Sequence, residues 1–229
     1  ILGGYPNRDN FKKCYQAVVE SGYDFIEIGI PFSEPVADGP VIAQAVYETL
    51  KNDVSLKMIR EDLNEVYSDQ VKNYFMTYSN IIYSYDLKKF SDDFKDVIRG
   101  ILIADLPNRM HSFFYERGFE IPIIPFVTPE SRDVDLEALK ETKADFIYFI
   151  GIRGITGGNA DLNNPEIFNH LQKIKEYTSK PIVMGFGIKD KIKANQALNI
   201  SDGFVIGTEA VKLQPNINDY QKFLKKIAD

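Results

Sequence analysis

Short apolar runs alternate with amphipathic segments along the whole chain, and this alternation constrains the fold more than any other feature. Buried parallel strands appear as continuous apolar runs, and the helices that connect them carry one apolar face. The runs predicted as strands are residues 25–30, 73–78, 101–104, 121–126, 145–151, 181–185 and 203–207. The stub at Ile1-Leu2 takes the place of a further strand in the alternation. Eight βα units predict an α/β fold, a closed (β/α)8 TIM barrel whose first strand is largely missing.

The segments between these runs have the periodicity of helices. Helices are predicted at residues 9–22, 41–50, 55–67, 87–98, 109–117, 133–142, 165–177, 189–198 and 217–228, with a short turn near Thr208. No linker or low-complexity tract interrupts them, and barrels of this length commonly form one domain. We therefore expect residues 1–229 to form a single barrel domain, with its active site at the C-terminal ends of the strands.

Charge and composition argue against several classes of ligand. The formal net charge of −6 lacks the basic face that a nucleic-acid backbone needs. No apolar run approaches the length of a membrane span, and the two histidines do not have metal-ligand spacing. The single cysteine, Cys14, and the lack of a secretory signal indicate a reducing cytoplasm. We expect a cytoplasmic protein that binds neither nucleic acid, membrane nor metal.

Glu27 stands inside a predicted strand whose isoleucines alternate with it. If Ile26 and Ile28 pack outward on helices, the side chain of Glu27 points into the barrel. Desolvation there would raise its pKa toward the range useful for proton transfer. Glu27 is thus a candidate general acid/base, although a structural carboxylate paired with a buried donor would look the same. Asp38 follows in the next loop, where Asp-Gly beside proline is by itself typical of a turn.

Glycines follow three consecutive late strands: Gly157, Gly187 and the pair Gly207-Thr208 that opens a short helix. This is the usual phosphate position in such barrels, because backbone N–H groups at a helix start hold an anion without a fixed cation. Any one of these glycines alone would be interpreted as a strand end or a cap. Together they predict a barrel of the phosphate-binding type.

The absences narrow the chemistry further. No predicted strand interior carries the lysine of a Schiff-base aldolase, and clustered His and carboxylate ligands of a metal-dependent aldolase are lacking. The glycine-rich nucleotide motifs are also absent. The remaining class of chemistry is acid/base catalysis on a small phosphate ester, without a cofactor.

The segment FIEIGIPFSEPVADGP at residues 25–40 closely resembles the signature of tryptophan synthase α subunits. The likeness continues through Gly4-Tyr5-Pro6, the ADLP at 104–107, the GITG at 154–157, the GFGI at 185–188 and Gly207-Thr208, so that it covers essentially the whole chain. The resemblance implies a lyase of tryptophan biosynthesis that cleaves indole-3-glycerol phosphate into indole and glyceraldehyde-3-phosphate.

Roles for individual residues follow from the same resemblance. It implies that Glu27 is the catalytic acid/base and that Asp38 binds the indole nitrogen. Substrate contacts are implied for Tyr148, Thr156, Gly157, Phe186, Gly187, Gly207 and Thr208. Thr156 would belong to a mobile lid, and its hydroxyl would reach Asp38 when the lid closes. From its position alone, Tyr148 would be a core aromatic residue.

The resemblance also implies a partner. A tryptophan synthase β subunit would bind in an α2β2 heterotetramer, and pyridoxal phosphate is expected only in that subunit. The expected contact residues are Pro31, Phe32, Ser33, Glu34 and Pro35.

Two departures from the family pattern and three alternative functions stay open. Glu34 stands where the family usually has Asp, and Ile152-Arg153 replaces a common Ser-Arg. The alternatives are a free-standing indole-glycerol-phosphate lyase, an idle barrel kept as an allosteric subunit, and another phosphate-binding barrel such as an epimerase.

Overall fold

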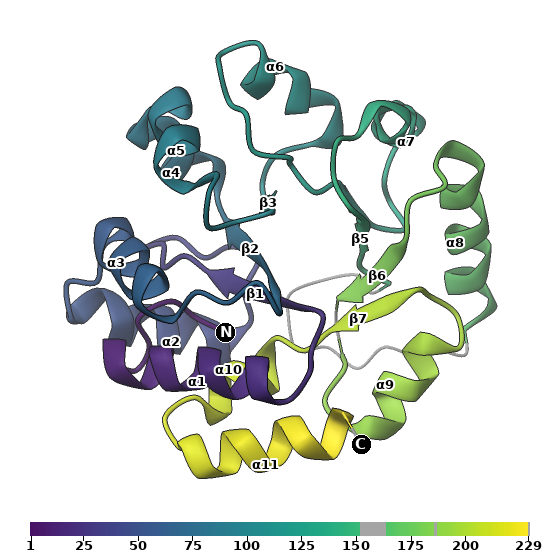
Figure 1. Ribbon diagram of the computed structural model, residues 1–229. Coiled ribbons are helices and arrows are strands. Elements are labelled where there is room, and N and C mark those ends of the chain that lie inside the picture. Colours follow the sequence, from purple (N-terminus) through teal and green to yellow (C-terminus); the bar gives the residue numbers. More distant parts are fainter. Residues whose placement is uncertain (152–163, 186, 229) are drawn as a thin grey trace.

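A computed structural model gives the structure of the protein and describes residues 1–151, 164–185 and 187–228. Within these ranges parallel strands form an inner layer and the helices surround them (Figure 1). The strands are β1 (Phe25–Gly29), β2 (Lys72–Thr77), β3 (Gly100–Ile103), β4 (Phe126–Val127), β5 (Ile147–Phe149), β6 (Ile182–Gly185) and β7 (Gly203–Val205). Each predicted strand therefore has a counterpart in the structure.

The outer layer follows the predicted order with local differences. The helices are α1 (Arg8–Glu20), α2 (Pro40–Lys51), α3 (Leu56–Val66), α4 (Ser79–Tyr85), α5 (Leu87–Phe94), α6 (His111–Tyr115), α7 (Asp133–Glu137), α8 (Pro165–Tyr177), α9 (Lys191–Leu198), α10 (Thr208–Leu213) and α11 (Ile217–Ala228). Two 3-10 turns, Asn108–Met110 and Ala138–Glu141, accompany α6 and α7. Helix α4 was not predicted. It is separated from α5 by Asp86, whose φ of 81° ends α4 and whose side chain caps α5.

Hydrogen bonds order the strands as β1-β2-β3 and β4-β5-β6-β7, all parallel. A bridge between Ile101 and Ile123 joins the two groups, and a second bridge sets Leu2 beside Gly29. The prediction of one continuous strand over 121–126 is wrong, because only the Ile123 bridge and β4 form there. Pro122 and Pro125 lack the N–H that a ladder needs, which explains the interruption.

The alternation in β1 separates two layers of the core. Ile26 and Ile28 are buried against the helices, in one cluster with Phe11 of α1 and Ile59 of α3. The prediction that these isoleucines pack outward is confirmed. Phe25 faces the interior instead, where it stacks on Phe146 with ring centroids 5.4 Å apart.

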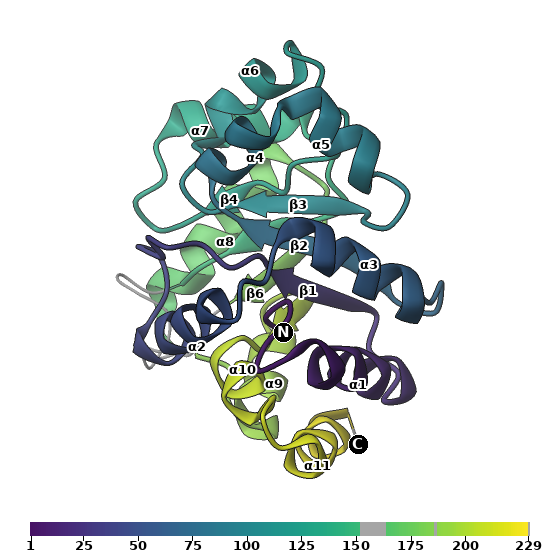
Figure 2. The same ribbon diagram turned by 90° about the vertical axis from the view of Figure 1, so that its left-hand side faces the viewer.

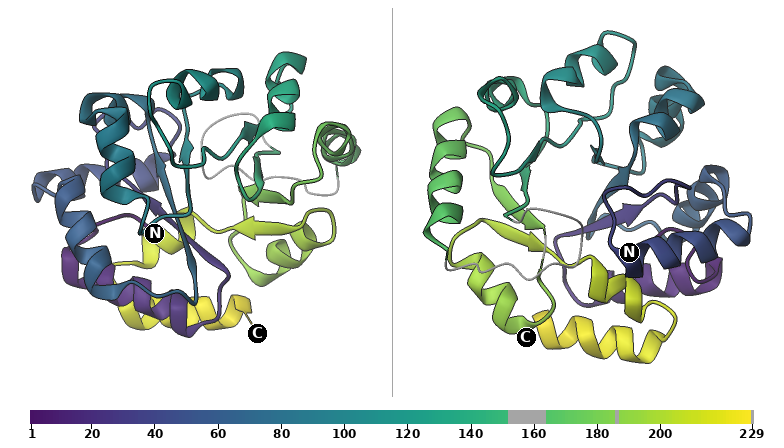
Figure 3. Two further views of the ribbon diagram at one scale, coloured as in Figure 1. Left: turned by 45° about the horizontal axis from the view of Figure 1, so that its top comes forward. Right: turned by 180° about the vertical axis from the view of Figure 1, so that it is seen from behind.

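The last helices lie beside the first, as the side view and two further views show (Figures 2 and 3). Helix α11 packs against α1, and α10 packs against α2. This arrangement brings the segment after β7 next to the loop after β1, so residues far apart in the sequence share one end of the barrel.

Candidate functional site

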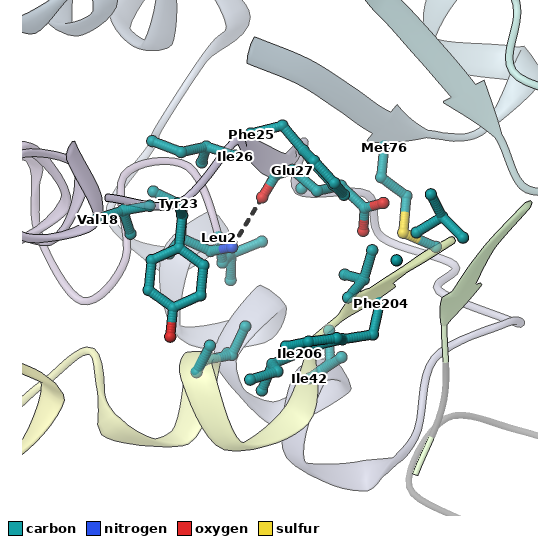
Figure 4. A pocket seen from close by; sticks show the side chains of 18 of the residues that line it. Leu2, Val18, Tyr23, Phe25, Ile26, Glu27, Ile42, Met76, Phe204 and Ile206 are labelled. Carbon is teal, nitrogen blue, oxygen red and sulfur yellow. Dashed lines mark hydrogen bonds between the residues drawn. The ribbon is translucent and has the colours of Figure 1, made fainter. Parts of the chain in front are cut away.

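A cavity of about 620 Å³ lies along β1 and β7, and Glu27, Asp38, Tyr78 and Gly207 line it together with apolar side chains. The carboxylate of Glu27 points into this cavity beside Met76, with Phe204 on the other side of the space (Figure 4). The position of Glu27 follows from the outward packing of its isoleucine neighbours. An acidic group therefore faces a largely apolar space.

The surroundings of Glu27 shift its proton affinity. Burial raises the pKa of Glu27 to about 7, and the carboxylate of Asp38 adds to this shift. The backbone nitrogen of Ile1 donates to the backbone oxygen of Glu27 at 2.8 Å, the bond drawn as a dashed line in Figure 4. With a pKa near neutrality, Glu27 can both accept and release a proton at ordinary pH.

Asp38 lies in the loop between β1 and α2, and Tyr78 at the end of β2 holds it. The hydroxyl of Tyr78 donates to a carboxylate oxygen of Asp38 at 3.0 Å and accepts from the backbone N–H of Ala37 at 3.0 Å. Burial raises the pKa of Asp38, while the Tyr78 hydrogen bond lowers it. The two contacts fix the carboxylate at the rim of the cavity.

Tyr78 was missed by the sequence analysis. Its signal was available, because Tyr78 is the last residue of a predicted strand and the C-terminal strand ends carry the active site in such barrels. What the sequence lacked was any sign that its hydroxyl meets the Asp38 loop.

Tyr148 of β5 is buried inside the barrel and its ring stacks on Phe126 with centroids 5.7 Å apart. Burial raises the pKa of Tyr148 well above its usual range, and the charges of Glu27 and Asp38 raise it further. A Cβ on Gly185 would lie 2.0 Å from the Tyr148 hydroxyl, so the ring needs a glycine opposite it. The hydroxyl of Tyr148 thus lies against Gly185 of β6.

The late loops meet at the same end of the barrel. Gly187 has a φ of +69°, a conformation that favours glycine. Gly207 is the N-cap residue of α10 and has no side chain with which to cap the first N–H groups of that helix. Thr208 begins that helix. Thr156, Gly157 and Phe186 lie outside the described residues.

The expected partner residues differ in exposure. Ser33 and Glu34 are exposed, and Phe32 and Pro35 are partly buried. Pro31 is buried in this chain. The ring of Phe32 packs on Tyr78 with centroids 5.0 Å apart.

Two features are absent from the described part of the chain. It holds no group of three or more His, Cys, Asp or Glu side chains placed to bind a metal ion. It also holds no helix with the length and apolar character needed to cross a membrane.

Comparisons with known proteins give one consistent family. The family described as tryptophan synthase alpha chain matches residues 1–228. The tryptophan synthase alpha chain of Thermotoga petrophila is 35% identical over 216 residues, which cover 93% of this chain and 87% of that protein. The alpha chain of Petrotoga mobilis is 33% identical over 232 residues, covering 99% and 90%.

Solved structures show the same fold. Tryptophan synthase subunit alpha from Campylobacter jejuni has a TM-score of 0.87 at 27% identity, covering 99% of this chain and 92% of that one. The alpha2beta2 tryptophan synthase complex of Pyrococcus furiosus, for which mutual activation is described, contains a chain with a TM-score of 0.86 at 24% identity, covering 99% and 95%. The predicted barrel fold is confirmed.

Proposed function

This chain belongs to the tryptophan synthase alpha chain family, whose reaction is the cleavage of indole-3-glycerol phosphate to indole and glyceraldehyde-3-phosphate, and we propose that Glu27 and Asp38 carry that cleavage here. The observation that carries the proposal is the cavity in which both carboxylates stand, with the pKa of Glu27 raised to about 7. An unrelated phosphate-binding barrel is excluded by the family match.

The proposed reaction moves one proton in total, from the hydroxyl group next to the indole ring to indole C3, and Glu27 is the group that carries it. Protonation of indole C3 makes the ring an electron sink, and Asp38 accepts a hydrogen bond from the indole N–H and balances its positive charge. Glu27 removes the proton from the hydroxyl next to the ring, the carbon–carbon bond breaks, and its electron pair restores the indole. The hydroxyl carbon becomes the aldehyde. We propose that this chain needs no cofactor of its own and that pyridoxal phosphate belongs to the β subunit.

Gly187, Gly207 and Thr208 are the described residues proposed to hold the phosphate, together with Gly157. The support is the uncapped start of α10, where N–H groups meet an anion favourably. We propose in addition that Phe186 lines the site and that the Thr156 hydroxyl reaches Asp38 when the lid closes.

Gly207→Ala is expected to weaken the binding of glycerol 3-phosphate without destabilising the fold. A Cβ at Gly207 meets no atom within 4 Å, so the fold accepts it, whereas a phosphate bound at the proposed site would be crowded by the added methyl group. We expect an affinity loss of roughly fivefold or more, about 1 kcal/mol, measured by calorimetry. Gly203→Ala in β7 serves as the control, since its Cβ would make only an ordinary contact with Val183. Equal affinities of parent and folded Gly207→Ala would remove Gly207 from the phosphate site.

We propose a tryptophan synthase β subunit as the partner, in an α2β2 assembly. The support is the position of the exposed Ser33 and Glu34 directly after Phe32 in the chain. The ring of Phe32 packs on Tyr78, and the Tyr78 hydroxyl donates to Asp38. A partner that orders this loop would order the carboxylate of Asp38. Such ordering shifts the population toward the reactive arrangement.

Adding β subunit is accordingly expected to stimulate indole release by this chain. Initial rates would be compared for the isolated chain, for the chain with β subunit, and for the chain with an unrelated protein at the same concentration. If the isolated chain turns over as fast as the complex, the free-standing lyase is the better description.

We also propose that residues 1–229 form one domain that works in the cytoplasm. Ile206 and Phe223 pack against both large clusters of the core, which supports a single folding unit. The single cysteine fits a reducing compartment.

A further inference from the structure

The segment at Ile1-Leu2-Gly3 forms a short parallel ladder with β1. The N–H of Gly29 donates to the backbone oxygen of Ile1 at 2.8 Å, and the N–H of Gly3 donates to that of Gly29 at 2.9 Å. In a parallel ladder the residue between two such bonds turns its own N–H and C=O to the opposite side. Leu2 therefore presents both groups away from β1, and it is buried.

The side-chain amide of Gln214 forms hydrogen bonds with both the N–H and the C=O of Leu2. Its oxygen accepts from the N–H of Leu2 at 2.6 Å, and its nitrogen donates to the backbone oxygen of Leu2 at 3.1 Å. The same nitrogen also donates to the backbone oxygen of Tyr5 at 3.1 Å. Gln214 is fully buried. The Gln214 amide thus makes the two hydrogen bonds to Leu2 that a neighbouring strand would otherwise make. In the described chain no backbone hydrogen bond joins β7 to Leu2.

Gln214 is also the residue that ends α10. This six-residue helix starts at Thr208, so the helix is too short to bend between its two ends. On the other side of the amide, the Leu2 segment is tied to the backbone of Glu27 and Gly29. One side chain therefore connects the helix of the proposed phosphate site to the strand of the proposed acid/base.

The packing around this connection is apolar and continuous. Leu2, Tyr5 and Val211 of α10 form one buried cluster with Ala45 and Val46 of α2. A shift of α10 would therefore have to move buried side chains of α2 as well. Close packing resists such a shift, because buried side chains have no free volume to fill.

We propose that Gln214 is a positioning residue that fixes the distance between the phosphate end and the indole end of the active site. The inference rests on the proposed function, because it needs a substrate that reaches from α10 to Glu27. Gln214 does not touch substrate. It determines how well the phosphate end and the indole end of the site fit one rigid ligand at the same time. The binding of a small ligand to either end depends only on the residues of that end.

Three ligands test this inference in the isolated chain: glycerol 3-phosphate for the phosphate half, indole for the other half, and indole-3-propanol phosphate for both at once. Gln214→Met keeps the length of the side chain and removes its three hydrogen bonds. We expect its affinity for the spanning ligand to fall about tenfold or more, while the affinities for the two small ligands stay within about twofold. The rate of cleavage should fall together with the affinity for the spanning ligand.

A matched control is available in the other half of the barrel. Asn108 is also buried, and its amide makes the same kind of paired contact with the backbone of Phe126, plus a third bond to the backbone oxygen of Asp135. Asn108→Leu also removes three side-chain hydrogen bonds, but at a place that does not connect the phosphate end of the site to the indole end. We expect a similar loss of thermal stability and unchanged ratios among the three affinities.

The outcomes separate the possible failures. If Gln214→Met lowers all three affinities in proportion, or changes none, Gln214 is only structural and the inference is overturned. If Gln214→Met does not fold, Gln214→Glu, which keeps the acceptor for Leu2 and loses the donor, is measured in the same way and judged by the same criterion. If the parent protein binds neither small ligand, the proposed function has failed rather than the role of Gln214.

Discussion

Replacing Glu27 with Gln is expected to lower the rate of indole release by roughly 10³-fold, near the middle of the range for the loss of a general acid/base group. The amide keeps the shape of the side chain but cannot exchange a proton at neutral pH. Because the cavity and the Asp38 loop do not change, binding of indole-3-propanol phosphate should stay within about threefold. Steady-state rates and calorimetry measure the two quantities.

The raised pKa of Glu27 gives this prediction a pH dependence. If Glu27 acts as the base, the activity of the parent should fall as the pH drops through about 7, where its carboxylate takes up a proton. Glu27→Gln should lose this step in the profile. A parent whose activity is flat between pH 6 and 8, or a variant with near-normal turnover, would remove Glu27 from the mechanism and favour the idle allosteric barrel.

The same raised pKa predicts that the parent protein loses stability as the pH rises, whereas its activity should rise. The pKa of Glu27 is raised from 4.5 in the unfolded chain to about 7 in the folded protein, so the folded state binds the proton more tightly. Ionised Glu27 therefore destabilises the fold progressively as the pH rises from about 4.5 through 7. Glu27→Gln should be more stable than the parent at pH 8 by on the order of 1–3 kcal/mol, and this gain should vanish below pH 4.5. Chemical denaturation at several pH values measures the difference.

Asp38→Asn is expected to lower the rate by about 10²-fold or more, with a much smaller change in KM. A neutral amide cannot balance the positive charge that forms on the indole ring in the transition state, whereas the neutral ground state loses little. A loss confined to KM would contradict this role for Asp38.

Tyr78→Phe is the matched control for Asp38. It keeps the ring that packs on Phe32 and removes only the hydroxyl between Asp38 and Ala37. The negative charge stays in place, so we expect a rate loss well below that of Asp38→Asn. Equal losses in the two variants would mean that the position of the loop, rather than the charge of Asp38, limits the reaction.

The local pattern of residues was sufficient for the inner layer of the barrel. Alternation in β1 predicted that Ile26 and Ile28 face the helices, and this is where they lie. The direction of Glu27 follows from the same alternation, because a strand has only two faces. The sequence also contained the reason for the interruption at Pro122 and Pro125, because proline has no N–H to donate to a strand ladder. The prediction of a continuous strand gave more weight to the apolar residues around these prolines.

The contacts that complete the site depend on which strands become neighbours, and periodicity carries no information on this point. Tyr78 reaches Asp38 across 40 residues because β2 pairs with β1 in one particular register. Gln214 reaches Leu2 across 212 residues only when the last helices return to the first strand. In the sequence Gln214 is an ordinary polar residue at the end of a short helix. The tertiary structure alone decided these pairings, because a hydrogen bond between distant residues forms only after the backbone has brought its donor and acceptor within about 3 Å.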